Sequence, residues 1–175
     1  GVPFAFSQGG GIDIRGIGTS IRNSTIVFNR SAQGGAGVHF DTAYIDALPD
    51  PVTEAADVPH FDLVLENTII AHNSSDVVDS DCLTTVGLSR ILSQGNNIDS
   101  DGSCYLDQPG DLSNTDPLVS ELKDNGGATD THALLPTSPA INAGKISNCT
   151  AADQRGVSRG VNGTCDIGAY EFDSI

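Results

Sequence analysis

Residues 9–14 read Gly-Gly-Gly-Ile-Asp-Ile, and residues 35–40 read Gly-Ala-Gly-Val-His-Phe. Both stretches begin with the same glycine spacing and continue with the same alternation of apolar and polar side chains, 26 residues apart (35 minus 9). A repeat of this length is typical of solenoid proteins, in which each repeat stacks on its neighbours. The pattern predicts coils of about 26 residues, in which each short strand pairs with its counterpart in the next coil.

A second repeat reads Asn-Ser-Thr-Ile-Val-Phe-Asn at residues 23–29 and Asn-Thr-Ile-Ile-Ala-His-Asn at residues 67–73. Aligned on the final asparagine, its copies lie 44 residues apart (73 minus 29), which is 18 more than the glycine repeat. The difference predicts an insertion between the copies. Residues 43–59 are the candidate because they hold three prolines and four acidic residues. We expect an exposed loop there, since proline cannot donate to a strand ladder.

Asparagine closes the strand-like runs of this repeat. We expect strands of three to five residues, at residues 20–22, 25–28 and 89–93 among others, with turns between them. Asparagine tolerates left-handed backbone geometry, and stacked asparagine side chains can hydrogen-bond along a solenoid axis. We therefore predict a ladder of Asn29 and Asn73, joined by Asn97. The alternative is that each of them is an ordinary turn residue.

The last third of the chain changes character, because proline or glycine interrupts it every few residues. Pro117, Pro136 and Pro139 push the residue before each of them toward extended geometry, and Gly126-Gly127 supplies a tight turn. A compact, turn-rich cap is predicted over residues 111–175, after solenoid coils over residues 1–110. Its apolar side chains are expected to cover one end of the core. We interpret His132 as a hydrogen-bonded structural histidine rather than a catalytic one, and Arg155 as a structural arginine paired with carboxylates.

This region contains six short motifs, one after another: Asp116-Pro117-Leu118, Asp124-Asn125-Gly126-Gly127, Thr131-His132-Ala133-Leu134-Leu135-Pro136, Ser138-Pro139-Ala140-Ile141, Asp153-Gln154-Arg155-Gly156 and Cys165-Asp166-Ile167-Gly168-Ala169-Tyr170-Glu171. The set resembles the choice-of-anchor Q domain, which closes right-handed parallel β-helix proteins of the bacterial cell surface. The resemblance implies an all-β fold, a right-handed parallel β-helix of about three coils, and a location outside the cell or on its surface. It implies no particular activity.

The four cysteines, Cys82, Cys104, Cys149 and Cys165, lie in Gly- and Ser-rich surroundings without the spacing of a zinc site. Disulfides are the expected state, with three possible connectivities. Pairing sequence neighbours, Cys82 with Cys104 and Cys149 with Cys165, needs the least rearrangement, and the family that the chain resembles places its cysteine pairs in the same way. Disulfides indicate an oxidising, extracytoplasmic compartment.

The composition is acidic, with 23 Asp and Glu against 8 Lys and Arg and a formal net charge of −15. Nucleic acid and anionic membrane surfaces are therefore poor partners, whereas cations and neutral sugars remain open. No apolar run reaches the length of a membrane-spanning helix. The chain starts at Gly1 without an initiator methionine or a signal-like segment, so we expect a mature or excised piece.

Asn97, Asp99 and Asp101, followed by Gly102, resemble the opening of a calcium loop, with oxygen ligands on alternate residues. Gln108 stands where the closing glutamate is needed. The alternatives are therefore a simple calcium site and an acidic turn stapled by Cys104, and the second is preferred. The sequence predicts no other cofactor.

No catalytic motif of the β-helical carbohydrate enzymes is present, and there is no nucleophile elbow, phosphate loop or HExxH. Three function classes stay open: a non-catalytic structural or adhesive extracellular module, a carbohydrate-binding module, and a piece of a carbohydrate-active enzyme. The first is preferred, because sugar-binding faces usually present Trp or Tyr and this chain has no Trp and 3 Tyr. The first coil is expected to be open. Its partners are predicted to be other copies of the chain, stacked end to end into filaments, or the rest of a longer β-helix.

Overall fold

The computed structural model describes residues 10–15, 18–32, 34–41, 61–77, 80–84, 89–161 and 163–172. The protein is all-β, built from strands of two to six residues. A single 3-10 turn, η1 (Ile146–Asn148), is the helical element among these residues. Short strands are what β-branched runs separated by Gly, Asn and Pro corners produce.

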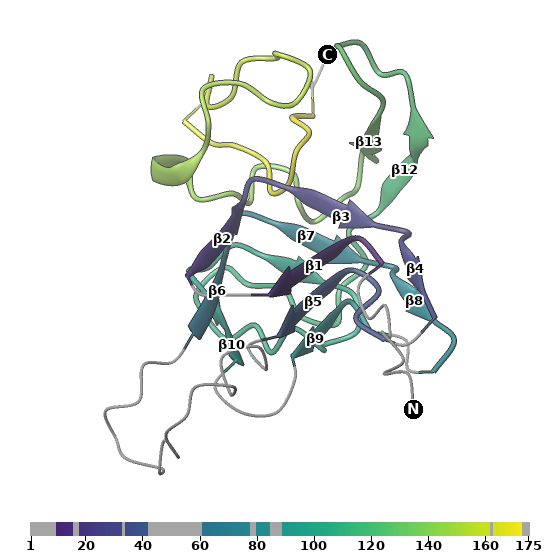
Figure 1. Cartoon of the computed structure of the whole chain (residues 1–175). Helices are drawn as coiled ribbons and strands as arrows, with labels where there is room; N and C mark the ends of the chain where they lie inside the picture. The colour runs from purple at the N-terminus through teal and green to yellow at the C-terminus, as the bar shows by residue number, and fades with distance from the viewer. Residues whose placement is uncertain are drawn as a thin grey trace, which may run out of the picture.

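Eleven of the thirteen strands form parallel sheets (Figure 1). In these sheets a strand pairs with the fourth strand after it, as β1 pairs with β5. The first sheet holds β1 (Ile12–Arg15), β5 (Val38–Asp41) and β9 (Cys82–Thr84). The second holds β2 (Thr19–Arg22), β6 (Phe61–Glu66) and β10 (Ser89–Ser93), and the third holds β3 (Thr25–Val27), β7 (Ile69–Ala71) and β11 (Ile98–Asp99). A fourth pairs β4 (Arg30–Ser31) with β8 (Ser74–Ser75). We call β1–β4 the first coil, β5–β8 the second and β9–β11 the third. This arrangement is compatible with a β-solenoid.

The pairing registers match both sequence repeats. Ile12 lies opposite Val38, an offset of 26, and Thr25 lies opposite Ile69, an offset of 44. The 18 additional residues therefore enter the second coil between Asp41, the end of β5, and Phe61, the start of β6. The predicted loop at residues 43–59 falls in this interval, outside the described residues.

The interior of the coils holds one apolar cluster, to which the first three sheets contribute. Its buried members include Phe40 from β5, Leu63 and Leu65 from β6 and Ile70 from β7. Ile12 and Ile14 of β1 pack against it but are only partly buried. The first coil is thus the less covered end of the stack.

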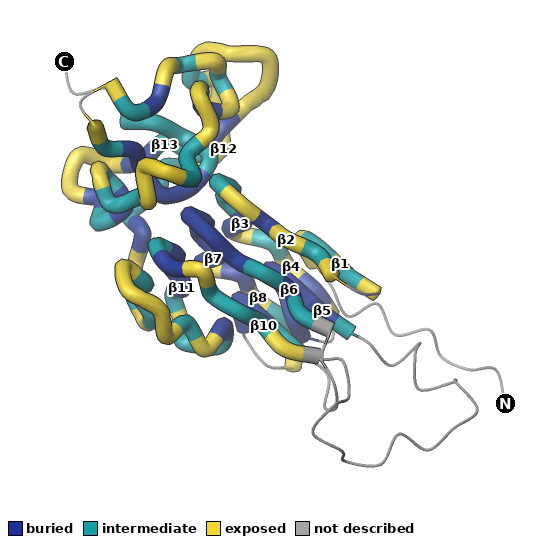
Figure 2. The backbone as a smooth tube through the Cα atoms, turned by 90° about the vertical axis from the view of Figure 1, so that its left-hand side faces the viewer, coloured by how far each residue is buried: buried dark blue, intermediate teal, exposed yellow. Residues whose placement is uncertain are grey.

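The cap contains an antiparallel hairpin, β12 (Val119–Lys123) and β13 (Thr131–Leu134), joined through a turn in which Gly126 has a φ of 81°. Figures 1 and 2 show the cap alongside the coils, next to β3 and β7. A second buried cluster joins Val27, Ile69 and Ala71 of the third sheet to cap residues, Leu134, Ala140 and Ile167. The third sheet is therefore buried on both faces, with Ile70 pointing to the interior and Ile69 to the cap.

The expectation that the cap covers the end of the core is wrong. The cap lies on the outer face of the third sheet instead, because the apolar side chains on that face also have to be shielded from water. The end is closed instead by the segment after β11: Cys104 is fully buried and Leu106 packs on the interior cluster. Leu112 adds a parallel bridge to Ile98, so parallel pairing extends just beyond residue 110.

Candidate functional site

The predicted asparagine ladder exists at two of its three positions. Asn29 donates its backbone N–H and its side-chain amide to Oδ1 of Asn73, both at 3.0 Å. Asn73 repeats the pattern, donating its backbone N–H at 3.1 Å and its Nδ2 at 2.9 Å to Oδ1 of Asp81. The ladder ends there, because an ionised carboxylate only accepts.

Asn97 does not belong to this ladder, so that part of the prediction is wrong. It lies at the start of β11, one residue before the Ile98–Ile69 pair, and its Oδ1 accepts the backbone N–H of Thr68 at 3.0 Å. The repeat at residues 67–73 has asparagine at both ends, and the register places Asn97 opposite Thr68, beside the first of these asparagines and far from Asn73. Asp81, which approaches from the third coil, takes the ladder position instead.

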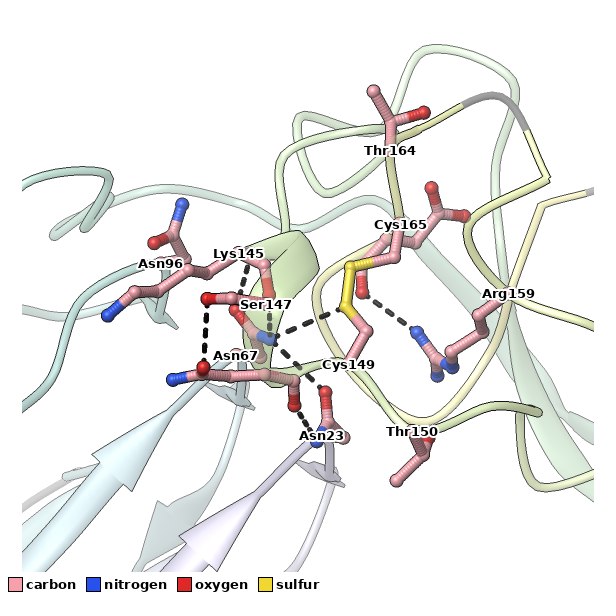
Figure 3. Close-up of a disulfide and its surroundings, with 12 residues drawn as sticks. Asn23, Asn67, Asn96, Lys145, Ser147, Cys149, Thr150, Arg159, Thr164 and Cys165 are labelled. Atoms are coloured by element: carbon pink, nitrogen blue, oxygen red, sulfur yellow. Dashed lines mark hydrogen bonds between the residues drawn. A yellow bond between two sulfur atoms is a disulfide. The ribbon is translucent and has the colours of Figure 1, made fainter.

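A second asparagine column, which the sequence analysis did not identify, links the coils to the cap (Figure 3). It consists of Asn23, Asn67 and Asn96, which all have left-handed backbone geometry, with φ of 47°, 48° and 58°. Nδ2 of Asn67 donates to Oδ1 of Asn23 at 3.2 Å. The signal was present in the sequence, because Asn23 and Asn67 open the two copies of the repeat.

Each member of this column bonds to one stretch of cap backbone, residues 143–148. Asn96 donates to the Ala143 carbonyl at 2.8 Å, and Asn23 donates to the Asn148 carbonyl at 3.0 Å. Between them, Oδ1 of Asn67 accepts the backbone N–H of Lys145 at 2.8 Å and its Nδ2 donates to the Lys145 carbonyl at 3.3 Å. The cap segment therefore crosses all three coils and is anchored to each.

Both disulfides join the predicted pairs. The Cys82–Cys104 bond ties β9 to the segment that closes the end of the coils. The Cys149–Cys165 bond lies inside the cap, next to the asparagine column, and Nδ2 of Asn67 lies 3.5 Å from Sγ of Cys149 (Figure 3). Each bond thus stabilises a region with little regular structure, and together they indicate an oxidising environment.

Arg155 lies in a buried cluster of charged side chains within the cap. Its guanidinium pairs with Asp153, donates to the Glu171 carbonyl at 2.6 Å and stacks over the Tyr170 ring at 3.6 Å. Arg159, which pairs with Glu171, donates to the carbonyls of Asp166 and Gly168. These contacts hold the final turns of the chain together.

Burial sets the electrostatics of this cluster. It raises the pKa of Asp166 and of Glu171, because a charged carboxylate loses its hydration there. Burial acts in the same direction on Asp153, but hydrogen bonds from the Glu171 N–H and from Arg155 outweigh it, and the net pKa of Asp153 is lowered. The carboxylates accept backbone N–H groups, as Asp153 does from Arg155, Val157 and Glu171.

His132 has a structural contact, since its Nδ1 lies 2.8 Å from the Ser120 carbonyl across the hairpin. Its ring also packs against Phe28, which stacks on His72 with centroids 5.4 Å apart in both contacts. These three rings join the turn after β3, the turn after β7 and the hairpin. The two histidine rings thereby cover part of Phe28, which is still 53% exposed.

The oxygens of the candidate calcium loop face different protein donors. Asp99 accepts from the Cys104 N–H at 3.0 Å and the Ser113 hydroxyl at 2.7 Å, while Asp101 accepts from the N–H groups of Asp81 and Ser103. Within the described ranges, no three His, Cys, Asp or Glu side chains converge on a possible metal position. Asp99 and Asp101 thus belong to a hydrogen-bonded acidic turn that the Cys82–Cys104 disulfide ties to β9.

A cleft of about 320 Å³ opens between the edge of the first coil and the cap. Thr25, Val27 and Asn29 line it from the coil, and Leu122, His132 and Gln154 line it from the cap. β3 forms the edge of its sheet, so one side of this strand lacks a paired neighbour among the described strands. The cleft thus combines an open strand edge with a second wall supplied by the cap.

Comparison with models of protein families, with curated proteins and with solved structures found no match. In the part of the chain that the structure describes, no helix has the length and apolar character to span a membrane.

Proposed function

We propose that this chain is a non-catalytic structural module of an extracellular or cell-surface protein, the capped terminal part of a right-handed parallel β-helix. One observation carries the proposal: the polar residues that a site would need are bonded to the protein itself. Asn73, Asp81, Asp99, His132 and Arg155 each hold a backbone group or another buried side chain. Polar groups committed in this way stabilise a fold and are not displayed to a substrate.

The way in which the cap is attached supports the same reading. The cap segment bonds to three successive coils. It therefore keeps most of its hydrogen bonds when its contact with any one coil is lost, and it holds the coils together. The buried face between the third sheet and the cap adds apolar contacts along the same line. A module that must bear load or terminate a stack needs this kind of attachment.

The first coil, whose strands β1 and β3 lack a paired neighbour on one side among the described strands, is the face through which such a module would join further β-structure. Unpaired strand edges attract other strands unless they are covered. The far end is different, since Asp101 Oδ2 and Ser103 Oγ accept the N–H groups of Asp81 and Cys82 at 2.9 Å. Stacking of copies from end to end would have to bypass these side chains, so filament formation is the less favoured form of association.

The test is a panel of plant and bacterial polysaccharides incubated with the purified protein. The proposal predicts no new reducing ends, no unsaturated products and no perturbation of backbone amide resonances by any polymer. Product formation would overturn it in favour of an enzyme, and saturable resonance shifts around the cleft would overturn it in favour of a carbohydrate-binding module. Immunolabelling of intact cells, with permeabilised cells as control, tests the predicted location.

A further inference from the structure

The first coil carries one polar group that is left over from a repeating pattern. Oδ1 of Asn73, in the second coil, accepts hydrogen bonds from the N–H and Nδ2 of Asn29 in the first coil. Oδ1 of Asp81 accepts hydrogen bonds from the same two groups of Asn73. Oδ1 of Asn29 has the equivalent position in the first coil. Among the described residues it accepts no hydrogen bond, although Asn29 uses its donors fully.

The backbone of β3 points the same way. The Ser24 carbonyl accepts from the Ile69 N–H at 2.9 Å, and the Phe28 N–H donates to the Ala71 carbonyl at 3.4 Å. These even-numbered residues therefore direct their backbone groups toward β7. Successive residues of a strand alternate in direction, so Thr25 and Val27 direct theirs toward the open edge. Among the described residues, the Val27 carbonyl accepts only from Nδ2 of Asn29, two residues later, at 3.3 Å.

We propose that the cleft between β3 and the cap is a docking site for one strand of a further β-helical coil, which the described residues do not supply. The strand pairs in parallel with β3 and ends in an asparagine that donates its N–H and Nδ2 to Oδ1 of Asn29. This inference rests on the proposed function and identifies the partner of the open coil. The mode of binding is strand addition to a sheet edge, in which main-chain bonds give affinity and side chains give register.

The pairing between the first and second coils indicates what kind of segment would occupy the cleft. Residues 23–31 sit on the second coil in the way that the partner would sit on the first, with Thr25 opposite Ile69 and Arg30 opposite Ser74. A second copy of this chain is a poorer occupant, because its far end has side chains over the N–H groups of β9. The cap wall, with Leu122 and His132, faces β3 across a cleft of about 320 Å³.

The probe is a synthetic peptide with the sequence of residues 23–31, Asn-Ser-Thr-Ile-Val-Phe-Asn-Arg-Ser, labelled at its N-terminus. We expect saturable binding by fluorescence anisotropy and slower hydrogen exchange at the Thr25 amide of the protein. A peptide that is N-methylated at its phenylalanine loses the N–H that faces β3 and should bind at least about tenfold more weakly. N-methylation at its valine, whose N–H points away, is the matched control and should change affinity little. Asparagine to alanine at the seventh position should weaken binding by a similar factor.

Absence of binding overturns the proposal, and so does binding in which both N-methyl peptides behave alike or the Thr25 amide stays unprotected. Self-association of the protein that the peptide competes away would identify a second copy as the occupant and would also overturn it. A peptide that fails to bind leaves the polysaccharide result untouched, so failure of this inference is distinguishable from failure of the proposed function.

Discussion

Asn67 in the second coil donates its side-chain amide to Oδ1 of Asn23 in the first coil, at 3.2 Å, while its own Oδ1 accepts the N–H of Lys145 in the cap. One residue therefore connects two coils with the cap. Both the side chain and the left-handed backbone, with φ of 48°, suit asparagine better than other residues. This junction explains why the cap lies along the coils and not across their end.

Replacing Asn67 tests the junction. Asn67→Gly keeps the left-handed backbone free of strain but removes every side-chain bond, and we expect it to lower the free energy of unfolding by about 3 kcal/mol. Asn114→Gly is the matched control, because Asn114 is exposed and has a φ of 52°. Chemical denaturation of both variants measures the difference. Equal effects would show that the column adds no stability.

The cap-facing side of the third sheet gives a second prediction. Ile69→Ala should destabilise the protein by about 2–5 kcal/mol, because Ile69 is fully buried between the sheet and the cap. Leu122→Ala removes an equally large side chain that is 58% exposed, so its effect should stay within about 0.5 kcal/mol. Thermal and urea unfolding of the two variants decide the matter. A neutral Ile69→Ala would contradict the packing described for the cap.

Much of the coil region follows from sequence patterns alone. The repeats predicted the 26- and 44-residue offsets, the strand at Ser89–Ser93 and the bond between Asn29 and Asn73, because periodicity constrains a stack in which every coil repeats the one before it. The position of the cap did not follow. Val27, Ile69 and Ala71 could equally have faced solvent or a partner, and only tertiary packing decides between these. The sequence patterns also did not identify Asp81 as a member of the ladder, because the segment around it does not match the repeat.

Asp81 predicts a pH effect. Burial raises its pKa above the ordinary value of 3.8, although Ser100 and Asn73 hydrogen bonds act against this. A carboxylate whose pKa is raised in the folded state contributes stability that is present below the unfolded value and is lost as the pH rises through the folded value. The stability advantage of the wild type over Asp81→Asn, which does not titrate, should therefore shrink between about pH 4 and neutrality. Urea unfolding across this range tests the sign, and an advantage that grows with pH would contradict it.

Each disulfide should add about 3 kcal/mol in the chain-entropy model, since the cysteines are separated by 22 and 16 positions. A double Cys149→Ala, Cys165→Ala variant is expected to lose that amount, and the double variant of Cys82 and Cys104 provides the comparison. Peptide mapping without reduction checks the pairing in the wild type. A peptide that joins Cys104 to Cys149 would refute it.

Deletion of residues 43–59 tests the register. It removes 17 residues and leaves Asp41 and Leu63 separated by 5 positions (63 minus 41 minus 17), against 4 between their counterparts Arg15 and Thr19. Because the pairs on either side stay in register, cooperative unfolding should be retained. Loss of cooperativity in the deletion variant, measured by calorimetry, would show that this segment contributes packing.

We expect the coils and the cap to form one cooperative structural unit, and native-state hydrogen exchange measures this directly. The informative amides are Ile98, which donates to Thr68 between coils, and Ile167 and Gln154, which donate to Ala140 and Ala169 within the cap. We expect all three amides to exchange through the same global unfolding, with one common free energy at low denaturant. Exchange of Ile167 and Gln154 at a clearly lower free energy than Ile98 would mean that the cap opens by itself, and would contradict it.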